Sequence, residues 1–211
     1  MDKRQAAAVA KQDDPSLVIA VSGTSGAGKS SVIATTAEML MGAARLHFDD
    51  YVTLGNDIAQ IRAWIDAGAD PDEIKTPVMA VDLRNLISGK PVQPPNGGSI
   101  VHPANYIMIE EPFGRARQEL AGLIDLTVYI DVPPEVALAR RIVREIASPQ
   151  KQAAQLVGEI EGQLLAFLAI GRDAYLAAAR AARDSADLLL DGMLPVDELA
   201  ASIVEEVRRR S

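Results

Sequence analysis

A glycine-rich stretch near the N-terminus has the residue types and spacing of a phosphate-binding loop. Residues 23–30 read Gly-Thr-Ser-Gly-Ala-Gly-Lys-Ser and fit the pattern G-x-x-x-x-G-K-[ST]. Glycines let successive backbone N–H groups turn toward a phosphate, and a helix N-terminus adds partial positive charge. In this pattern Lys29 reaches the β- and γ-phosphate oxygens, and the Ser30 hydroxyl binds Mg²⁺. The residues expected to bind the nucleotide are Gly23, Thr24, Ser25, Gly26, Ala27, Gly28, Lys29, Ser30 and Ser31.

The segments on either side of the loop predict the structural context that such a loop requires. Leu17–Ser22 is a short apolar run rich in β-branched residues, typical of a strand buried on both faces of a sheet. From Lys29 the apolar residues lie close to one helical face, and Gly42 predicts the end of that helix. A glycine-rich turn that binds nothing would have no use for the Lys-Ser pair, so we infer a nucleotide site.

Two pairs of carboxylates follow two further predicted strands. Arg45–Phe48 precedes Asp49-Asp50, and Tyr106–Ile109 precedes Glu110-Glu111. Ligands of open α/β sheets gather beyond the carboxyl ends of the strands, so both pairs are expected near the phosphate loop. A kinase uses such groups to accept the proton of an acceptor hydroxyl and to hold Mg²⁺. Each pair alone could instead cap a helix or begin a solvated turn.

An arginine-rich helix is expected to complete the site. Arg140, Arg141 and Arg144 follow a predicted strand at Leu126–Ile130, and spacings of three and four place them on one helical face. Guanidinium groups there could stabilise the charge on a transferring phosphoryl group, while surface solvation is the alternative. Lys29, one of the strand-end carboxylates, and Arg140 and Arg144 are therefore the candidates for catalytic roles.

Composition excludes several other classes of protein. The 211 residues carry a net charge of −8 and are 48% hydrophobic, which suits one folded domain and argues against a broad nucleic-acid surface. The chain has no cysteine, which excludes disulfides and thiol nucleophiles. It also lacks the Asn-Lys-x-Asp and Leu-Ser-Gly-Gly-Gln segments of GTP switches and ABC ATPases. We expect no membrane-spanning run, no membrane or nucleic-acid partner, and a cytoplasmic location.

Predicted strands and helices alternate along the chain, which favours a parallel sheet covered on both faces. Helices are expected over 57–67, 78–88 and from Pro195, with a long helical stretch over 135–183 that is interrupted near Pro149. A final strand is expected over 188–190. Residues 1–16 are expected to be a flexible lead, and 17–211 a single domain.

The order of these segments resembles that of uridine kinase-like and nicotinamide riboside kinase-like P-loop kinases. The resemblance rests on the phosphate loop, Phe48–Tyr51, Leu86–Val92, Ile109-Glu110, and the stretches 131–144 and 186–192. It implies the P-loop NTPase fold, with a five-stranded parallel sheet, helices on both faces and a helical lid. It also implies ATP and Mg²⁺ as cofactors and a small hydroxyl metabolite, such as a nucleoside, as the acceptor.

The same resemblance implies roles for individual residues. Asp49 would be the catalytic base and a neighbour of Mg²⁺, with Glu110 and Ser30 beside the metal. Residues 140–152 would form the lid, with Arg140 over ATP, and 56–102 a segment on the substrate side. Asp50 and Tyr51 would lie on the acceptor side. From their own positions in the sequence, His102, Glu111 and Arg115 are further candidates for contact with the acceptor.

Other readings remain open at this stage. Lys75 stands where uridine kinases have the aspartate that holds ribose, so the acceptor is undetermined, and so is the choice between ATP and GTP. A nucleoside monophosphate kinase would need cations for the acceptor phosphate, which Lys75, Arg84, Lys90 and Arg115 could supply. A non-catalytic ATP-binding regulatory module is the third reading, and a homodimer is one open partner state.

Overall fold

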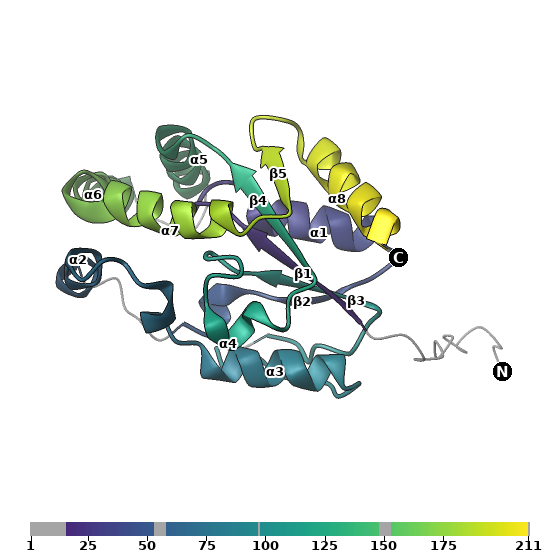
Figure 1. Ribbon diagram of the computed structural model, residues 1–211. Helices are drawn as coiled ribbons and strands as arrows, with labels where there is room; N and C mark the ends of the chain where they lie inside the picture. The colour runs from purple at the N-terminus through teal and green to yellow at the C-terminus, as the bar shows by residue number, and fades with distance from the viewer. Residues whose placement is uncertain (1–15, 53–57, 97, 148–152, 211) are drawn as a thin grey trace.

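Five parallel strands lie in the order β2-β3-β1-β4-β5 in this computed structural model, which describes residues 16–52, 58–96, 98–147 and 153–210 (Figure 1). The strands are β1 (Leu17–Ser22), β2 (Ala44–Leu46), β3 (Tyr106–Glu110), β4 (Leu126–Asp131) and β5 (Leu188–Asp191). The three central strands bury nearly all their side chains because helices cover both faces, and their sequences are therefore continuously apolar. The predicted α/β fold with a five-stranded parallel sheet is confirmed.

Helices pack on the two faces of the sheet with separate apolar clusters (Figure 1). On one face, α1 (Lys29–Met39) and α8 (Val196–Arg210) pack their apolar residues against β1, β3 and β4. On the other face, α3 (Pro77–Ile87) and α4 (Gln118–Ala121) cover β1, β2 and β3. Met79, Leu83 and Leu86 of α3 are fully buried. Part of the segment 56–102 therefore builds the core rather than a substrate-side surface.

The connection from β1 leads toward β2, whereas the connection from β3 leads toward β4 on the opposite side. Neighbouring parallel strands whose connections diverge leave a crevice at their carboxyl ends, where ligands bind in open α/β folds. The phosphate loop follows β1 at this position, and Glu110 ends β3 beside it. The topology alone thus brings two of the predicted site segments together.

The strand β2 is shorter than the sequence suggests. It ends at Leu46, and the next residues form the 3₁₀ turn η1 (Phe48–Asp50), in which the Asp50 N–H donates to the His47 carbonyl at 3.1 Å. The Tyr51 N–H donates to the Phe48 carbonyl at 3.0 Å. The turn leaves Asp49 exposed to solvent and buries Tyr51 in the core, although the two residues are only two positions apart.

The helical stretch after β4 consists of α5 (Pro134–Ile146), α6 (Ala153–Ala166), the π-helical segment η3 (Phe167–Gly171) and α7 (Arg172–Asp184). The remaining short elements are α2 (Ile58–Asp66) and η2 (Pro71–Glu73). The helices predicted over 57–67, 78–88 and from Pro195 begin and end within about two residues of their predicted bounds, which is the usual spread, whereas the short α4 has no counterpart among the predicted helices. Residues 1–15 of the predicted lead 1–16 and the break predicted near Pro149 lie outside the described residues.

Ala153–Asp184 is one continuous helical segment of 32 residues, and its most apolar window has a mean hydropathy of 1.3. Glu159 and Glu161 interrupt its apolar residues, so this segment is not the continuous apolar run that the sequence is expected to lack, although length and composition alone would let the helix cross a membrane. A single helix of this kind is weak support for a membrane span. In the structure α7 contacts α2 and α5, so its inner side belongs to the folded domain.

Candidate active site

The phosphate loop connects β1 to α1 with a backbone that needs glycine. Gly26 has φ +94°, and a Cβ atom there would lie 2.2 Å from the carbonyl oxygen of Ala137. Gly28 has φ +93° and directly precedes the first turn of α1. Positive φ and this close approach are tolerated by glycine alone without strain. The loop therefore presents its backbone and the N-terminus of α1 to the crevice, as an anion site requires.

Lys29, Ser30 and Glu110 form one connected cluster at the mouth of the crevice. The Lys29 ammonium donates to the Thr24 carbonyl at 3.1 Å and lies 3.3 Å from Glu110 Oε1. The Ser30 hydroxyl donates to Glu110 Oε2 at 3.2 Å. His47 Nδ1 lies 3.3 Å from the same Oε2 atom. The ends of β1, β2 and β3 thus each supply a polar group to this cluster.

The charged groups of this cluster favour one another's ionised forms. Burial opposes ionisation of Glu110, but the hydrogen bond with His47 and the charge of Lys29 outweigh it and lower its pKa to about 2. The hydrogen bond with Glu110 raises the pKa of His47 against the opposing effect of burial. Glu110 is therefore a carboxylate throughout the physiological pH range, as an oxygen ligand for a cation must be.

A cavity of about 260 Å³ lies over the loop and collects most of the predicted nucleotide and catalytic residues. Its lining residues are Ser25, Gly26, Gly28, Lys29, Ser30, Ser31, Asp49, Glu110, Arg140, Arg141 and Arg144. Gly23 and Thr24 border the neighbouring cavity instead, and the Ala27 side chain is buried in the core. Four cationic side chains face this cavity, which suits it to a polyphosphate.

The three arginines of α5 differ in how they are held. Arg140 donates from Nη1 to the Gly192 carbonyl at 3.0 Å, which fixes it against the loop after β5. Arg141 donates to the Tyr175 hydroxyl, and its Cζ atom lies 5.4 Å from that ring. Within the described residues the Arg144 side chain has no hydrogen-bond or ion-pair partner. Arg141 thus joins the cavity although only Arg140 and Arg144 were predicted as catalytic, and the lid residues 148–152 lie outside the described part.

The oxygen atoms near the loop fit Mg²⁺ held mainly by a nucleotide. Ser30 and Glu110 place oxygens within hydrogen-bond distance of each other, and Asp49 lines the same cavity. Mg²⁺ prefers such hard oxygen ligands and commonly takes phosphate oxygens and waters for the rest. Among the residues that the structure describes, no group of three or more Asp, Glu or His side chains could hold a metal ion. The protein would therefore contribute only part of the coordination.

A second cavity, of about 310 Å³, shares Lys29, Asp49 and Glu110 with the phosphate cavity and extends toward α2 and α7. Apart from these three groups its walls are mainly apolar. Its aromatic residues come from four separate segments: Phe48, Trp64, Phe113 and Tyr175. We name it the acceptor cavity, because it opens onto both carboxylates and the lysine.

Sequence reasoning missed this aromatic wall. Trp64 packs against Phe113 with ring centroids 6.1 Å apart, and it also lines the cavity. The Trp64 Nε1–H donates to the Asp70 carbonyl at 2.8 Å, so the indole presents an apolar face. No local pattern links these aromatic residues along the chain, and only the alternation of strands and helices brings them together.

Three residues predicted on the acceptor side lie elsewhere. Tyr51 is buried, with its hydroxyl donating to Asp82 Oδ2 at 2.9 Å, because the turn after Asp49 directs it under α3. Glu111 is fully buried and paired with Arg117. Arg115 pairs with Asp187 at 2.7 Å and donates to the Asp125 carbonyl, at the opposite ends of β4 and β5. These assignments are corrected accordingly.

Asp50 and His102 lie together in a different cavity. They line a cavity of about 650 Å³ at the β2 edge of the sheet, beside His47. His47 therefore separates this cavity from Glu110, which it contacts. The hydrogen bond between His47 and Glu110 could not be predicted, because a strand pattern does not show which polar group a residue contacts.

The pair Glu111–Arg117 supports the acceptor cavity from behind. Arg117 donates from Nε to Glu111 Oε1 at 3.0 Å and from Nη1 to the Ile74 carbonyl at 2.7 Å. Its Cζ atom lies 5.3 Å from the Phe48 ring, next to Asp49. Both side chains of the pair are completely inaccessible to solvent. Breaking such a pair leaves a buried charge without compensation.

Replacing Arg117 by Met is expected to lower the free energy of unfolding by about 3–5 kcal/mol, because Glu111 would lose its counter-ion inside the protein. Urea unfolding followed by circular dichroism measures this change. Arg183→Met is the matched control, since Arg183 pairs with Asp131 where both side chains are about half exposed, and such pairs contribute about 1 kcal/mol or less. Equal losses in the two variants would contradict the assignment.

Comparisons with known proteins agree with this fold and loop. No protein-family model matches the chain. A uridine kinase from Borreliella burgdorferi (strain ZS7) is 22% identical over 183 residues, covering 82% of this chain and 85% of the relative. A proposed fructose transport system kinase from Silicibacter sp. TM1040 superposes with a TM-score of 0.54 at 19% identity, covering 90% of this chain and 92% of that one.

A second solved structure, described as a possible uridine kinase from Bacillus stearothermophilus, has a TM-score of 0.53 at 16% identity and covers 86% of this chain and 92% of that one. At such identities the structural likeness shows the fold. The chain is a P-loop protein that resembles uridine kinase-like P-loop kinases over most of its length.

Proposed function

We propose that this protein is an ATP- and Mg²⁺-dependent kinase that transfers the γ-phosphoryl group to a hydroxyl of a small, unphosphorylated metabolite. The observation that carries the proposal is one set of groups shared by two cavities. Lys29, Asp49 and Glu110 line both the cationic cavity over the phosphate loop and the aromatic acceptor cavity. A phosphoryl donor and an acceptor would therefore meet at these three side chains. The kinase names of the relatives agree with this reading.

The residues around the loop have different roles in the transfer reaction. Bound Mg·ATP supplies the activated phosphoryl group, and the loop with Lys29 holds the β- and γ-phosphates. Asp49 accepts the proton of the acceptor hydroxyl, since its carboxylate is exposed in both cavities and has no side-chain partner within the described residues. Arg140, Arg141 and Arg144 neutralise charge on the transferred group from the other side.

The acceptor cavity favours an acceptor without phosphate. Within the described residues Lys29 is the only cation that lines it, and Lys29 already pairs with Glu110. Of the cations considered for a monophosphate, Arg115 pairs with Asp187, and Arg84 donates to the Ala80 carbonyl at 3.4 Å. Lys75 and Lys90 are exposed and do not line the cavity. A phosphorylated acceptor in this cavity would therefore meet the carboxylates of Asp49 and Glu110, while the one lysine there is already paired with Glu110.

The test is a panel of acceptors assayed by ADP release with Mg·ATP and, separately, Mg·GTP. The panel contains nucleosides, hydroxylated vitamins and sugars, each paired with its monophosphate where one exists. We expect at least one unphosphorylated compound to stimulate ADP release by a hundredfold or more, and its monophosphate to give no stimulation. Stimulation by monophosphates alone would favour the monophosphate-kinase reading. A protein that binds ATP but responds to no acceptor would favour the regulatory module.

A further inference from the structure

The acceptor cavity is polar at one end and apolar at the other. Four of its polar side chains also line the phosphate cavity, namely Ser25, Lys29, Asp49 and Glu110. A fifth, Tyr175, accepts a hydrogen bond from Arg141, which lines the phosphate cavity too. The hydroxyl oxygen of Thr24 is inaccessible to solvent and offers no group to the cavity. Apart from the Trp64 indole, the accessible polar side chains therefore gather at the end where a phosphoryl group would be transferred.

The opposite end has an apolar wall that belongs to neither of the two core clusters of the sheet. Its largest side chains are those of Phe48, Val52, Ile61, Trp64, Ile74 and Phe113. All of these except Phe113 are only half-buried. Single exposed apolar side chains are ordinary, but several that share one concave wall are typical of a binding site. The wall therefore indicates an occupant that covers it with apolar surface.

The hydrogen-bonding side chains next to this wall already have partners within the protein. The Trp64 Nε1–H donates to the Asp70 carbonyl at 2.8 Å. The Arg117 Cζ atom lies 5.3 Å from the centre of the Phe48 ring and 6.0 Å from that of the Phe113 ring, and each of its three side-chain nitrogens donates to protein oxygens. A sugar hydroxyl or the polar edge of a base would lose water at this wall without gaining a protein partner, whereas an apolar ring would lose nothing.

The charges around the wall favour an uncharged occupant. Cationic groups bind over aromatic rings, but the guanidinium of Arg117 already lies over the rings of Phe48 and Phe113. Among the described residues that line the cavity, the only carboxylates are those of Asp49 and Glu110, and both lie at the transfer end. An ammonium group at the apolar end would therefore have a positive charge behind the rings and no carboxylate beside it.

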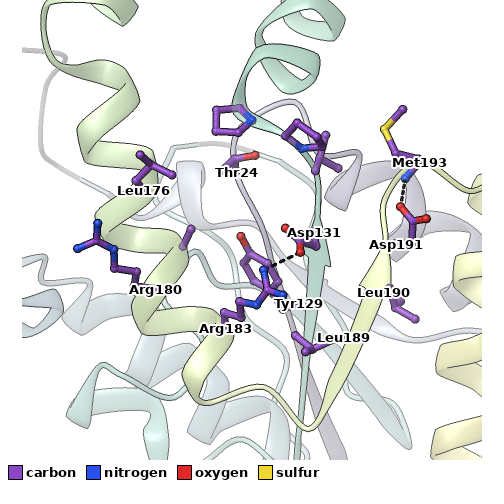
Figure 2. Close-up of a pocket in the computed structure, with 14 residues that line it drawn as sticks. Thr24, Tyr129, Asp131, Leu176, Arg180, Arg183, Leu189, Leu190, Asp191 and Met193 are labelled. Carbon is purple, nitrogen blue, oxygen red and sulfur yellow. Dashed lines mark hydrogen bonds and ion pairs between the residues drawn. The ribbon is translucent and has the colours of Figure 1, made fainter.

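Two neighbouring cavities lack the groups that transfer requires. One, of about 540 Å³, lies between α7 and the ends of β4 and β5, where Arg183 pairs with Asp131 at 2.7 Å (Figure 2). The other, of about 790 Å³, extends from α2 to α6. Lys29 and Glu110 line neither of them. A compound held in either cavity would not meet the lysine that is expected to hold the transferred phosphoryl group.

On the basis of the proposed transfer reaction, we propose that the acceptor is a small uncharged alcohol whose hydroxyl lies on a short arm of an apolar aromatic ring. The ring packs against Trp64 and Phe113, and the hydroxyl faces Asp49. The acceptor oxygen bonds to the γ-phosphorus, the bond from this phosphorus to the β–γ bridging oxygen breaks, ADP leaves with that electron pair, and Asp49 takes the hydroxyl proton. The cavity is at the lower end of the usual range for ligands, about 300–1,000 Å³, which suits a body of about one ring.

The first experiment measures binding through Trp64, which is the only tryptophan of the chain and lines the acceptor cavity. The probe is 4-isopropylbenzyl alcohol. Its matched partner, 4-(hydroxymethyl)benzamide, has the same number of non-hydrogen atoms but carries an amide in place of the isopropyl group. With a non-hydrolysable ATP analogue and Mg²⁺ present, we expect a saturable change of tryptophan fluorescence with the probe and a Kd about tenfold or more higher for the benzamide. Equal affinities, tighter binding of the benzamide, or no saturable change would overturn the inference.

The second experiment measures ADP release, and it separates the failure of this inference from the failure of the proposed function. The acceptor panel is extended by the two benzyl alcohols and by choline. We expect 4-isopropylbenzyl alcohol to stimulate ADP release more than nucleosides, sugars or choline do. Stimulation by those polar or cationic compounds alone would overturn the apolar acceptor and leave the kinase standing. Binding of the apolar alcohol without ADP release from any compound would overturn the transfer reaction, and the cavity would then be a site for such molecules only.

A variant tests the position of the apolar body. Ile74 is half-buried and lines none of the described cavities except the acceptor cavity, so Ile74→Asn places an amide in the apolar wall. We expect the ratio of the two Kd values to fall from about tenfold or more to about one, because the benzamide gains a partner and the isopropyl group loses an apolar contact.

Ile65→Asn is the matched control, because Ile65 is also a half-buried isoleucine but lines none of these cavities. This control is expected to keep the ratio of the unchanged protein. An unaltered ratio in Ile74→Asn, with an unchanged circular dichroism spectrum, would overturn the position assigned to the apolar body. The comparison of the two alcohols in the unchanged protein does not depend on how either variant folds.

Discussion

Replacing Lys29 by Met is expected to lower kcat about a thousandfold while the protein stays folded. The Lys29 ammonium is held in place by the Thr24 carbonyl and Glu110, and its side chain is 8% exposed. A fixed charge in such a water-poor place stabilises developing charge on phosphate oxygens without reorganising during the reaction. A thousandfold loss corresponds to about 4 kcal/mol of transition-state stabilisation. Met keeps the length of the side chain and removes only the charge.

The measurement is turnover with the acceptor identified by the panel, at saturating Mg·ATP, together with circular dichroism of the variant. Lys90→Met is the matched control, because Lys90 is exposed in the turn after α3 and lines none of the cavities described above. The control is expected to retain kcat within a factor of two. A Lys29→Met protein with near-normal kcat would show that the loop does not carry the transferred phosphoryl group.

Asp49→Asn is expected to reduce kcat by about 10²–10⁴-fold, the usual contribution of a positioned general base. The amide has the size of the carboxylate but cannot take the hydroxyl proton. The KM for ATP should change little, since the cationic groups around the phosphate cavity remain. A fall in kcat with an unchanged KM indicates that the lost interaction is made only in the transition state.

The neighbouring Asp50→Asn is the natural comparison for Asp49. Asp50 lines the separate cavity at the β2 edge with His102, so its kcat is expected to fall by less than a factor of ten. The two variants differ by one position in the 3₁₀ turn η1 and by nothing in chemistry. If Asp50→Asn were inactive and Asp49→Asn active, the assignment of the proton acceptor would have to be exchanged.

Local sequence patterns were sufficient to predict the fold and to predict which side chains gather around the loop. The loop spacing predicts where a phosphate would bind, and short apolar runs predict strands buried on both faces. Once those strands are parallel, their carboxyl ends meet at one edge, so Glu110 and Asp49 must come near Lys29. The arginines of α5 follow from the same rule, because their helix begins where β4 ends.

The sequence could not decide which member of a carboxylate pair faces the ligand. Successive residues of extended chain point to opposite sides, so Glu110 meets Lys29 while Glu111 is directed into the core toward Arg117. A shift of the strand by one residue would have exchanged the two glutamates, and the sequence is equally compatible with both arrangements. The 3₁₀ turn separates Asp49 from Tyr51 in the same way.

Only the tertiary structure supplied the aromatic wall of the acceptor cavity. It consists of Phe48, Trp64, Phe113 and Tyr175, of which the first and the last are 127 positions apart, and no spacing rule connects them. Periodicity reports which side of a strand or helix is apolar, whereas the contacts made there depend on how distant elements pack.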